Sequence, residues 1–188
     1  MVKRPADTRS ATELVSVVRA GQRPKFVFFW GHQPSPSGLL TQTCLSQWWP
    51  ARFAAKNHEF ASAEHYMMWS KASLFDDEGR AKAVLAARSP AQAKTIGRQV
   101  EGFNEAVWVE HRWRIVVEAS LAKFSNNPAL RDYLVGTKQK VLVEASPVDR
   151  IWGIGLPADS DKAENPDQWR GLNLLGFALM EARQQLLG

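Results

Sequence analysis

The stretch from residue 62 to residue 124 contains one helix start signal after another. Ser62, Ser89 followed by Pro90, and Asn104 are residue types that open helices, and each precedes a segment with helical hydrophobic spacing. Hydrophobic spacing along the chain predicts helices over residues 13–20, 63–75, 79–87, 90–97, 104–124 and 173–187. A chain of 188 residues with so much helix has room for only a small β-sheet.

Three short segments have the apolar and aromatic composition of strands. Phe26–Trp30 lies between a proline and a glycine, and Val141–Ala145 precedes a loop with two glycines. Arg52–Phe60 could pair with Phe26–Trp30. Because 45% of the residues are apolar, the chain can bury the core of one domain. We therefore expect a single compact, helix-rich α+β domain with a small β-sheet.

The positive charge of the chain lies mostly at its N-terminus. Residues 1–25 contain six basic and two acidic side chains, which leaves only about +1 of the formal net charge of +5 for the rest. That remainder is too small to indicate a basic nucleic-acid-binding face. We predict a basic arm over residues 1–25, able to move independently, followed by one domain over residues 26–188.

Cysteine and histidine usage argues against several kinds of site. Cys44 is the only cysteine, so no internal disulfide and no thiolate metal cluster can form. His58-Glu59 begins like a zinc-protease helix motif, but Ser62 occupies the position of the second histidine. We expect no metal and no cofactor. Because no apolar run is long enough to span a bilayer or to form a secretory signal, we expect a cytoplasmic protein without membrane contact.

The segment 63–75 combines charged and apolar side chains on one face. Glu64, Met68, Lys71 and Phe75 recur at near-helical spacing. Glu64 and Lys71 are separated by a rise of roughly 10 Å, which is too long for direct i,i+4 pairing, so they could flank a ligand. The alternative is that Lys71 extends to solvent and that Glu64 only favours the positive end of the helix.

The segment 104–124 carries a second candidate, because Arg112 follows Trp108 by one turn on an otherwise apolar stripe. An arginine that points inward needs an anionic partner. The partner could be Glu64, another internal carboxylate, or a substrate phosphate held by two hydrogen bonds. Spacing alone favours an internal salt bridge.

The loop that follows Val141–Ala145 contains a carboxylate, Asp149, and a large ring, Trp152, beside Gly153 and Gly155. Loops at strand ends often bind ligands, and glycines allow the backbone to approach them closely. The glycine spacing does not match a phosphate-binding fingerprint. Trp152 as a plain core residue is an equally good interpretation of this pattern.

Taken together, these segments and their neighbours resemble the NADAR/YbiA-like family over roughly residues 26–187. The matches, in family order, are Phe60–Met68, Lys71-Ala72, Leu74-Phe75-Asp76, Lys94, Gly97-Arg98, Trp108, Arg112, Lys123-Phe124, Leu142–Pro147, Asp149, Trp152-Gly153, Gly171–Gly176 and Arg183. So many ordered matches are more specific than any one of them.

The resemblance implies a compact α+β fold and cleavage of the C–N bond between a base and a ribose. Family members include N-glycosidases acting on phosphoribosylated pyrimidine intermediates of riboflavin synthesis, and others bind ADP-ribose or remove it from guanine. We expect a hydrolase of the first kind. The alternatives are an ADP-ribosyl hydrolase acting on ADP-ribosylated guanine in DNA or RNA, and a non-catalytic ADP-ribose-binding module.

The expected ligand is a small N-riboside or an ADP-ribose-type molecule, and nucleic acid enters only as an ADP-ribosylated substrate. A purely structural protein is disfavoured, because polar residues stand at the motif positions Glu64, Lys71 and Asp149. From the resemblance, Glu64 is the principal acid/base, stabilising an oxocarbenium-like transition state or orienting water, and Asp149 positions the ribose or the water. Alternatively, Lys71 forms a Schiff base with an opened sugar.

The remaining site residues are expected to bind substrate. Trp108 and Trp152 would enclose the base or the sugar, and Arg112 and Arg98 would hold phosphate. The sequence departs from the family at Gln47, where many members have asparagine, which changes the expected polarity of the pocket at that position.

Overall fold

The computed structural model describes residues 3–188, which divide into two compact units. The first unit takes in the residues up to 46 together with 129–188, and the second takes in residues 47–128. Helices dominate both units, and the chain is a helix-rich α+β protein, as predicted. Across residues 3–188, no helix combines the length and apolar character that a membrane crossing requires.

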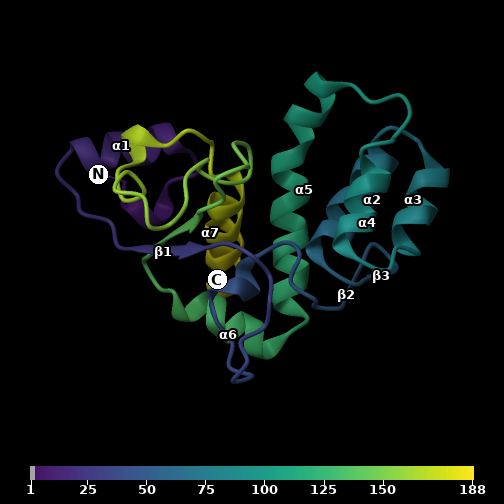
Figure 1. Cartoon of the computed structure of the whole chain (residues 1–188), viewed down its shortest axis with the longest axis horizontal. Coiled ribbons are helices and arrows are strands. Elements are labelled where there is room, and N and C mark those ends of the chain that lie inside the picture. The colour runs from purple at the N-terminus through teal and green to yellow at the C-terminus, as the bar shows by residue number, and fades with distance from the viewer. Residues whose placement is uncertain (1–2) are drawn as a thin grey trace. The chain divides into compact units, whose positions relative to one another are not determined.

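The first unit is built around two parallel strands. Phe26 pairs with Val141 and Phe29 with Glu144, and helix α7 packs against β4 (Figure 1). Parallel pairing needs a long connection between the strands, and here much of that connection belongs to the second unit. The elements of the first unit are η1 (Pro5–Asp7), α1 (Ala11–Arg19), β1 (Phe26–Phe29), η2 (Gln42–Leu45), α6 (Pro128–Gly136, whose first residue belongs to the second unit), β4 (Val141–Glu144), η3 (Pro166–Gln168) and α7 (Leu174–Leu187).

Asn173 joins helix α7 to strand β4. Its buried side chain accepts a hydrogen bond from the Glu144 amide at 2.9 Å and donates one to the Leu142 carbonyl at 2.9 Å. These are the bonds that a further strand would make, so Asn173 satisfies the open edge of β4. A Cβ atom at Gly176 would overlap the Leu142 carbonyl oxygen, so glycine is needed for the first turn of α7 to lie on the strand.

The second unit places a β-hairpin beside helix α2, which also contacts α3, α4 and α5 (Figure 1). Lys56 and Asn57 form the hairpin turn with φ angles of 51° and 61°, the left-handed conformation that a two-residue hairpin turn requires. The Tyr66 hydroxyl donates to Glu118 at 2.9 Å and so connects α2 to α5. The elements are β2 (Phe53–Ala55), β3 (His58–Phe60), α2 (Ala63–Leu74), α3 (Glu78–Leu85), α4 (Pro90–Gly97) and α5 (Glu105–Ser125).

The strand pairing suggested for residues 52–60 is wrong. This segment forms β2 and β3, which pair with each other, while β1 pairs with β4. The tight turn at Lys56 and Asn57 folds the segment back on itself, which one continuous strand over residues 52–60 would not allow. All six predicted helices are present, and α6 was missed although Pro128 stands at its first position.

Residues 3–25 contain regular structure. Helix α1 buries Leu14 and Val17, and its last turn carries Arg19, which pairs with Asp167 at 2.8 Å. Arg9 forms a further ion pair with Glu181 of α7 at 2.5 Å. The division into an arm over residues 1–25 and a domain over residues 26–188 stays a prediction.

Candidate active site

Helix α2 presents Glu64 in its first turn, with the residue only 2% exposed. The Glu64 amide donates to the Gln47 carbonyl at 3.0 Å, so the segment before β2 holds the start of the helix. A carboxylate at this position also lies at the positive end of the helix dipole. Burial places the Glu64 carboxyl where the effective dielectric constant is low, so electrostatic interactions with neighbouring groups are stronger there than in water.

A buried histidine fixes this end of α2. The Ser62 hydroxyl lies 2.8 Å from His65 Nδ1, and His65 Nε2 lies 3.2 Å from the Ala87 carbonyl. A carbonyl only accepts, so Nε2 carries the proton and Nδ1 accepts from Ser62. Ser62 occupies the N-cap position as predicted, but its hydroxyl bonds to the ring of His65 instead of to the backbone. These two hydrogen bonds connect the turn that carries Glu64 to the segment just after α3.

Lys71 lies two turns further along α2 and is partly buried. Its Nζ donates to the Gly97 carbonyl at 2.9 Å and lies 4.0 Å from the Phe103 ring centroid and 5.8 Å from that of Trp108. Burial lowers the pKa of Lys71, Glu105 raises it, and Arg98 lowers it further. The net effect is a lowered pKa, which increases the fraction of neutral amine.

Gly97 makes the Lys71 contact possible. A Cβ atom there would overlap the side chain of Met68, which lies between Glu64 and Lys71 on the same face of α2. Because Gly97 has no side chain, the end of α4 lies close enough to α2 for the Gly97 carbonyl to accept a hydrogen bond from Lys71. Glycine at this position therefore helps to hold the amine in place.

Trp108 and Arg112 occupy successive turns of α5. Trp108 is 9% exposed and faces Lys71, whereas Arg112 is half-buried. The internal salt bridge favoured for Arg112 is wrong, since no carboxylate among residues 3–188 lies within ion-pair distance of it. The reason is that α5 places no acidic residue three or four positions from Arg112. Its guanidinium is therefore not neutralised by a helix neighbour.

Arg98 stands at the C-cap of α4 and is exposed. It is near enough to Lys71 to lower the pKa of that amine. The second unit thus brings Lys71, Trp108 and Arg98 together, while Glu64 and Arg112 lie on the same two helices as Lys71 and Trp108.

Asp149 and Trp152 belong to the first unit, in the loop after β4. Asp149 Oδ1 accepts hydrogen bonds from the amides of Ile151 and Trp152, both at 2.8 Å. The Asp149 amide donates to Ser146 Oγ at 3.2 Å. One carboxylate oxygen is therefore engaged in forming the loop. Trp152 is half-buried, so it is not a plain core residue.

A distant segment holds this loop in place. The amides of Leu172, Asn173 and Leu175 donate to the carbonyls of residues 150, 153 and 152 at 2.9, 3.1 and 3.1 Å. A Cβ atom at Gly171 would overlap the Gly153 carbonyl oxygen. The segment at the start of α7 thus fixes the backbone of residues 150–154, and this backbone sets the position of Trp152.

Two further residues near Lys71 and Glu64 were missed as site residues. Phe103 lies directly under the Lys71 amine, and Gln47 is 6% exposed with its Oε1 atom accepting no hydrogen bond from residues 3–188. Phe103 precedes the start of α5 and shows no periodic signal, so spacing could not have found it. Gln47 was noticed only as a departure from the family pattern.

Comparison with solved structures defines the fold. The NMR structure of the Escherichia coli protein YbiA superimposes with a TM-score of 0.65 at 23% sequence identity, covering 88% of this chain and 87% of that one. The chain therefore has the helix-rich α+β fold of YbiA.

Sequence comparison then gives the family. The NADAR domain model matches residues 28–187, and the chain belongs to the NADAR family. N-glycosidase R617 of Acanthamoeba polyphaga mimivirus is 40% identical over 166 residues, covering 86% of this chain and 96% of the relative. The chloroplastic riboflavin biosynthesis protein PYRR of Zea mays is 38% identical over 109 residues, covering 56% of this chain and 16% of that protein.

Proposed function

We propose that this chain hydrolyses the C–N bond between a base and a phosphorylated ribose, with pyrimidine intermediates of riboflavin synthesis as substrates. At the level of enzyme class, the mimiviral relative that matches nearly its whole length is named an N-glycosidase, and this chain is a hydrolase of N-glycosyl compounds. The name of the maize relative supports the riboflavin branch, through the segment that the two proteins share.

The observation that carries the proposal is that a buried carboxylate and a partly buried amine stand on the same helix. Glu64 is 2% exposed, and burial lowers the pKa of Lys71. Both side chains come from one helix, whose N-terminus is fixed by Ser62 and His65, so both stand on a regular structural element. Trp108 beside Lys71 offers an aromatic surface suited to a flat base.

Glu64 is the proposed acid/base. As the base leaves, the anomeric carbon gains positive charge, which a carboxylate in a low-dielectric setting stabilises. The C–N bond breaks and the departing nitrogen takes a proton, while water adds its oxygen to that carbon and gives up a proton to Glu64. Asp149 is proposed to position the ribose or the water, using the carboxylate oxygen that the loop does not engage.

Binding is proposed to rest on aromatic and basic side chains. Trp108 and Trp152 would contact the base or the sugar. Arg112, which no described carboxylate neutralises, would hold the phosphate together with Arg98.

The second route uses Lys71 as a nucleophile. A neutral Lys71 amine can attack the anomeric carbon and displace the base, which leaves with a proton. The sugar ring then opens to an imine on Lys71, and water hydrolyses the imine to release the sugar. The lowered pKa of Lys71 favours this route, whereas its hydrogen bond to Gly97 must break first. Borohydride reduces an imine to a stable secondary amine, so a covalent adduct on Lys71 identifies this route, and its absence during turnover assigns the chemistry to Glu64.

The test of the proposal is Glu64→Gln, which keeps the shape of the side chain and removes its charge. We expect base release to fall by about two to four powers of ten while the circular dichroism spectrum and Tm stay unchanged. Glu78→Gln is the matched control, since Glu78 also stands in the first turn of a helix but its side chain is 86% exposed. Normal turnover by a folded Glu64→Gln variant removes Glu64 from the mechanism.

A substrate panel tests the branch. Phosphoribosylamino-pyrimidines and ADP-ribosylated guanine DNA are incubated with the protein and scored by mass spectrometry, with calorimetry on ADP-ribose alongside. Release of the pyrimidine supports the proposal. Turnover of only the guanine adduct, or binding of ADP-ribose without any turnover, replaces it with the corresponding alternative.

A further inference from the structure

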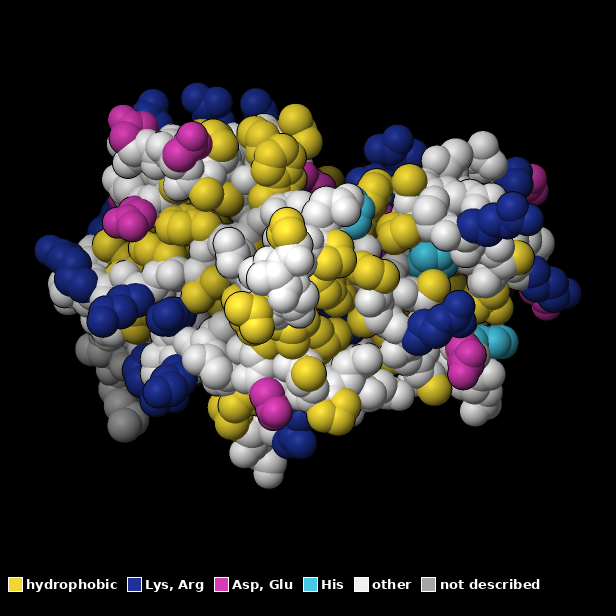
Figure 2. Space-filling model, turned by 60° about the horizontal axis from the view of Figure 1, so that its bottom comes forward, with side chains coloured by type: hydrophobic (Ala, Val, Ile, Leu, Met, Phe, Trp, Pro, Cys, Tyr) yellow, Lys and Arg dark blue, Asp and Glu magenta, His cyan; other side chains and the backbone are white. Residues whose placement is uncertain are grey.

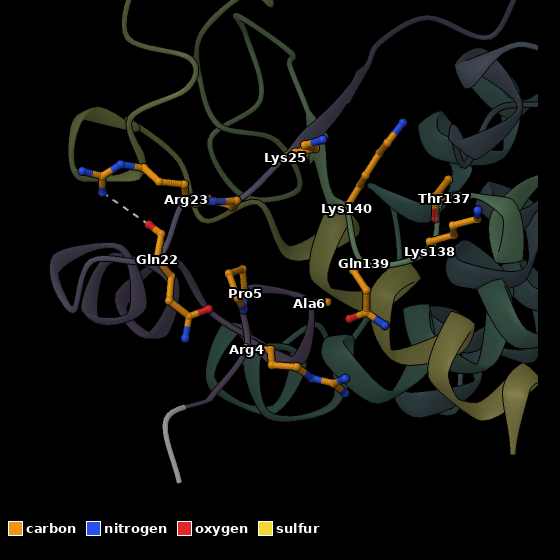
Figure 3. A pocket seen from close by; sticks show the side chains of 11 residues that line it. Arg4, Pro5, Ala6, Gln22, Arg23, Lys25, Thr137, Lys138, Gln139 and Lys140 are labelled. Atoms are coloured by element: carbon orange, nitrogen blue, oxygen red, sulfur yellow. Dashed lines mark hydrogen bonds between the residues drawn. The ribbon is translucent and has the colours of Figure 1, made fainter.

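Basic side chains stand in two kinds of setting in this protein. In Figure 2 the Lys and Arg side chains of the face in view project from the surface, where water surrounds their charged ends. The pocket of about 560 Å³ in the first unit is bordered by side chains of this kind, and in Figure 3 the charged ends of Arg4, Arg23 and Lys140 point away from one another. Lys71 of the second unit differs, because its charged end lies among other groups of the protein.

The groups around the Lys71 amine are rich in electrons. Its Nζ donates to the Gly97 carbonyl at 2.9 Å and lies over the ring of Phe103, 4.0 Å from the centroid. The centroid of the Trp108 ring lies 5.8 Å away. A carbonyl oxygen accepts N–H bonds and an aromatic face attracts a cation, whereas neither attracts the lone pair of a neutral amine. These contacts therefore favour the ammonium form of Lys71.

The other influences on Lys71 act in both directions. Burial lowers the pKa of the amine most, Glu105 raises it, and Arg98 lowers it. Attraction by an aromatic face opposes the effect of burial, and this attraction grows stronger where water is removed. The Phe103 ring thus stabilises the positive charge at the place where burial penalises it.

Phe103 is held by the segment that joins α4 to α5. Its ring packs edge to face against Phe75, with 5.4 Å between the centroids. Before it, Gly102 adopts a φ of 68°, and after it Asn104 caps α5 by accepting a hydrogen bond from the Val107 amide at 3.2 Å. The residue is nevertheless 41% exposed. Burial of apolar surface explains this phenylalanine only in part, and its contact with the amine gives it a further role.

We propose that Phe103 is a positioning residue that keeps Lys71 as an ammonium above its ring, so that Lys71 supplies the proton to the departing base. This inference rests on the proposed hydrolysis, in which the leaving nitrogen takes a proton as the C–N bond breaks. Lys71 gives a proton to that nitrogen, while water adds to the anomeric carbon and gives a proton to Glu64. Exchange with solvent then returns a proton to Lys71 and removes one from Glu64.

The first test is the pKa of Lys71 in the full chain without substrate, measured by NMR titration of protein labelled in its lysine side chains. The Lys71 signal is the one that is lost in Lys71→Arg. Phe103 is replaced by a trifluorinated phenylalanine, which nearly keeps the shape of the ring and removes most of the negative charge of its face. We expect the pKa of Lys71 to fall by about half a unit or more. An unchanged pKa overturns the proposal.

Ordinary substitutions extend this test. Phe103→Leu keeps an apolar contact and lacks the aromatic face, so the pKa of Lys71 should fall, whereas Phe103→Tyr keeps the face and should leave it near its original value. The trifluorinated residue at position 75 is the matched control, because Phe75 packs against Phe103 but does not lie under the amine. An equal fall of the pKa with the fluorinated residue at either position would show a general packing effect and overturn the proposal.

The pH dependence of base release tests the proton transfer. An ammonium donates a proton only below its pKa, so turnover should fall as pH rises through the pKa of Lys71. Phe103→Leu should move this fall to lower pH, and Phe103→Tyr should not. A fall at an unchanged pH in Phe103→Leu, or a borohydride-stable adduct on Lys71 during turnover, overturns the assigned proton transfer. The NMR titration needs no substrate, so an absence of base release counts against the proposed hydrolase and not against the Lys71–Phe103 contact.

Discussion

Helix α2 and the loop over residues 146–155 hold their polar side chains in different ways. In α2, Glu64 and Lys71 take their places from the regular spacing of a helix, and Lys71 needs only one contact from α4. In the loop, Asp149 and the neighbouring backbone depend on hydrogen bonds within the loop and with residues 170–175. A helix thus presents functional groups by its own geometry, whereas a loop presents them through contacts with distant chain.

The glycines at the two places show the same difference. A Cβ atom at Gly171 would overlap a backbone carbonyl oxygen and lie 2.8 Å from the Arg150 Cα atom. At Gly97 the atoms in the way belong to the side chain of Met68, which can move. Backbone cannot yield without breaking the hydrogen bonds of the loop, so the loop should tolerate an added methyl group less well than the helix pair.

Gly171→Ala should have the largest effect. We expect a loss of about 3 kcal/mol or more in the free energy of unfolding, against about 1–2 kcal/mol for Gly97→Ala, both measured by urea denaturation. Adding Met68→Ala should restore part of the loss at position 97, since it removes the overlapping side chain. Equal losses for the two single variants would contradict the proposed difference between backbone and side-chain obstruction.

Asp149 should show an intermediate effect and can separate loop formation from chemistry. Asp149→Ala removes the acceptor of two backbone amides, and we expect a loss of about 1–2 kcal/mol in unfolding free energy. Asp149→Asn keeps a carbonyl oxygen in the Oδ1 position, so it should lose less than about 1 kcal/mol. Urea denaturation and base-release rates are compared for both variants.

If Asp149 also positions the ribose or the water, Asp149→Asn should lose turnover while its unfolding free energy stays near that of the unchanged protein. Ser146→Ala is a useful control, because it removes the 3.2 Å hydrogen bond to the Asp149 amide and leaves the carboxylate. Asn and Ala variants that are equally destabilised would show that Oδ1 does not hold the loop.

The sequence predicts where the helices lie, but it does not predict which distant segments pack or pair with one another. Ser89, Pro90 and Asn104 act within a single turn, so α4 and α5 begin within a residue of their predicted starts. The pairing of β1 with β4 joins residues more than a hundred positions apart, which no local signal encodes. Asn173 completes the edge of β4 in the same non-local way.

The candidate site divides along the same line. Glu64, Lys71, Trp108 and Arg112 were placed on helices by spacing, and the structure keeps them there. The Lys71 bond to Gly97 comes from another helix, and spacing could not predict it. Arg112 was assigned an internal salt bridge from the expectation that an inward cation is paired, and the structure shows it unpaired by any described carboxylate.

His65 gives the smallest effect, and it probes the attachment of α2 by pH. Burial lowers the pKa of His65, although its bond to Ala87 partly raises it. In the unfolded chain a histidine has a pKa of about 6.5, so below that pH the unfolded state binds a proton that the folded state refuses. The folded protein should therefore lose stability as pH falls below about 6.5, until the folded pKa is reached.

The unfolding free energy should fall by at most about 1.4 kcal/mol for each pH unit below about 6.5. The measurement compares the unfolding free energy at about pH 7.5 with that at about pH 5.5. His65→Gln should flatten this dependence, while His58→Gln, a change at an exposed histidine of the same unit, should leave it unchanged. Protonation of Nδ1 would also make Ser62 face a second donor, so base release should fall over the same range if this contact positions Glu64. A pH dependence that persists in His65→Gln would show that other groups govern it and that α2 is not held by a neutral histidine.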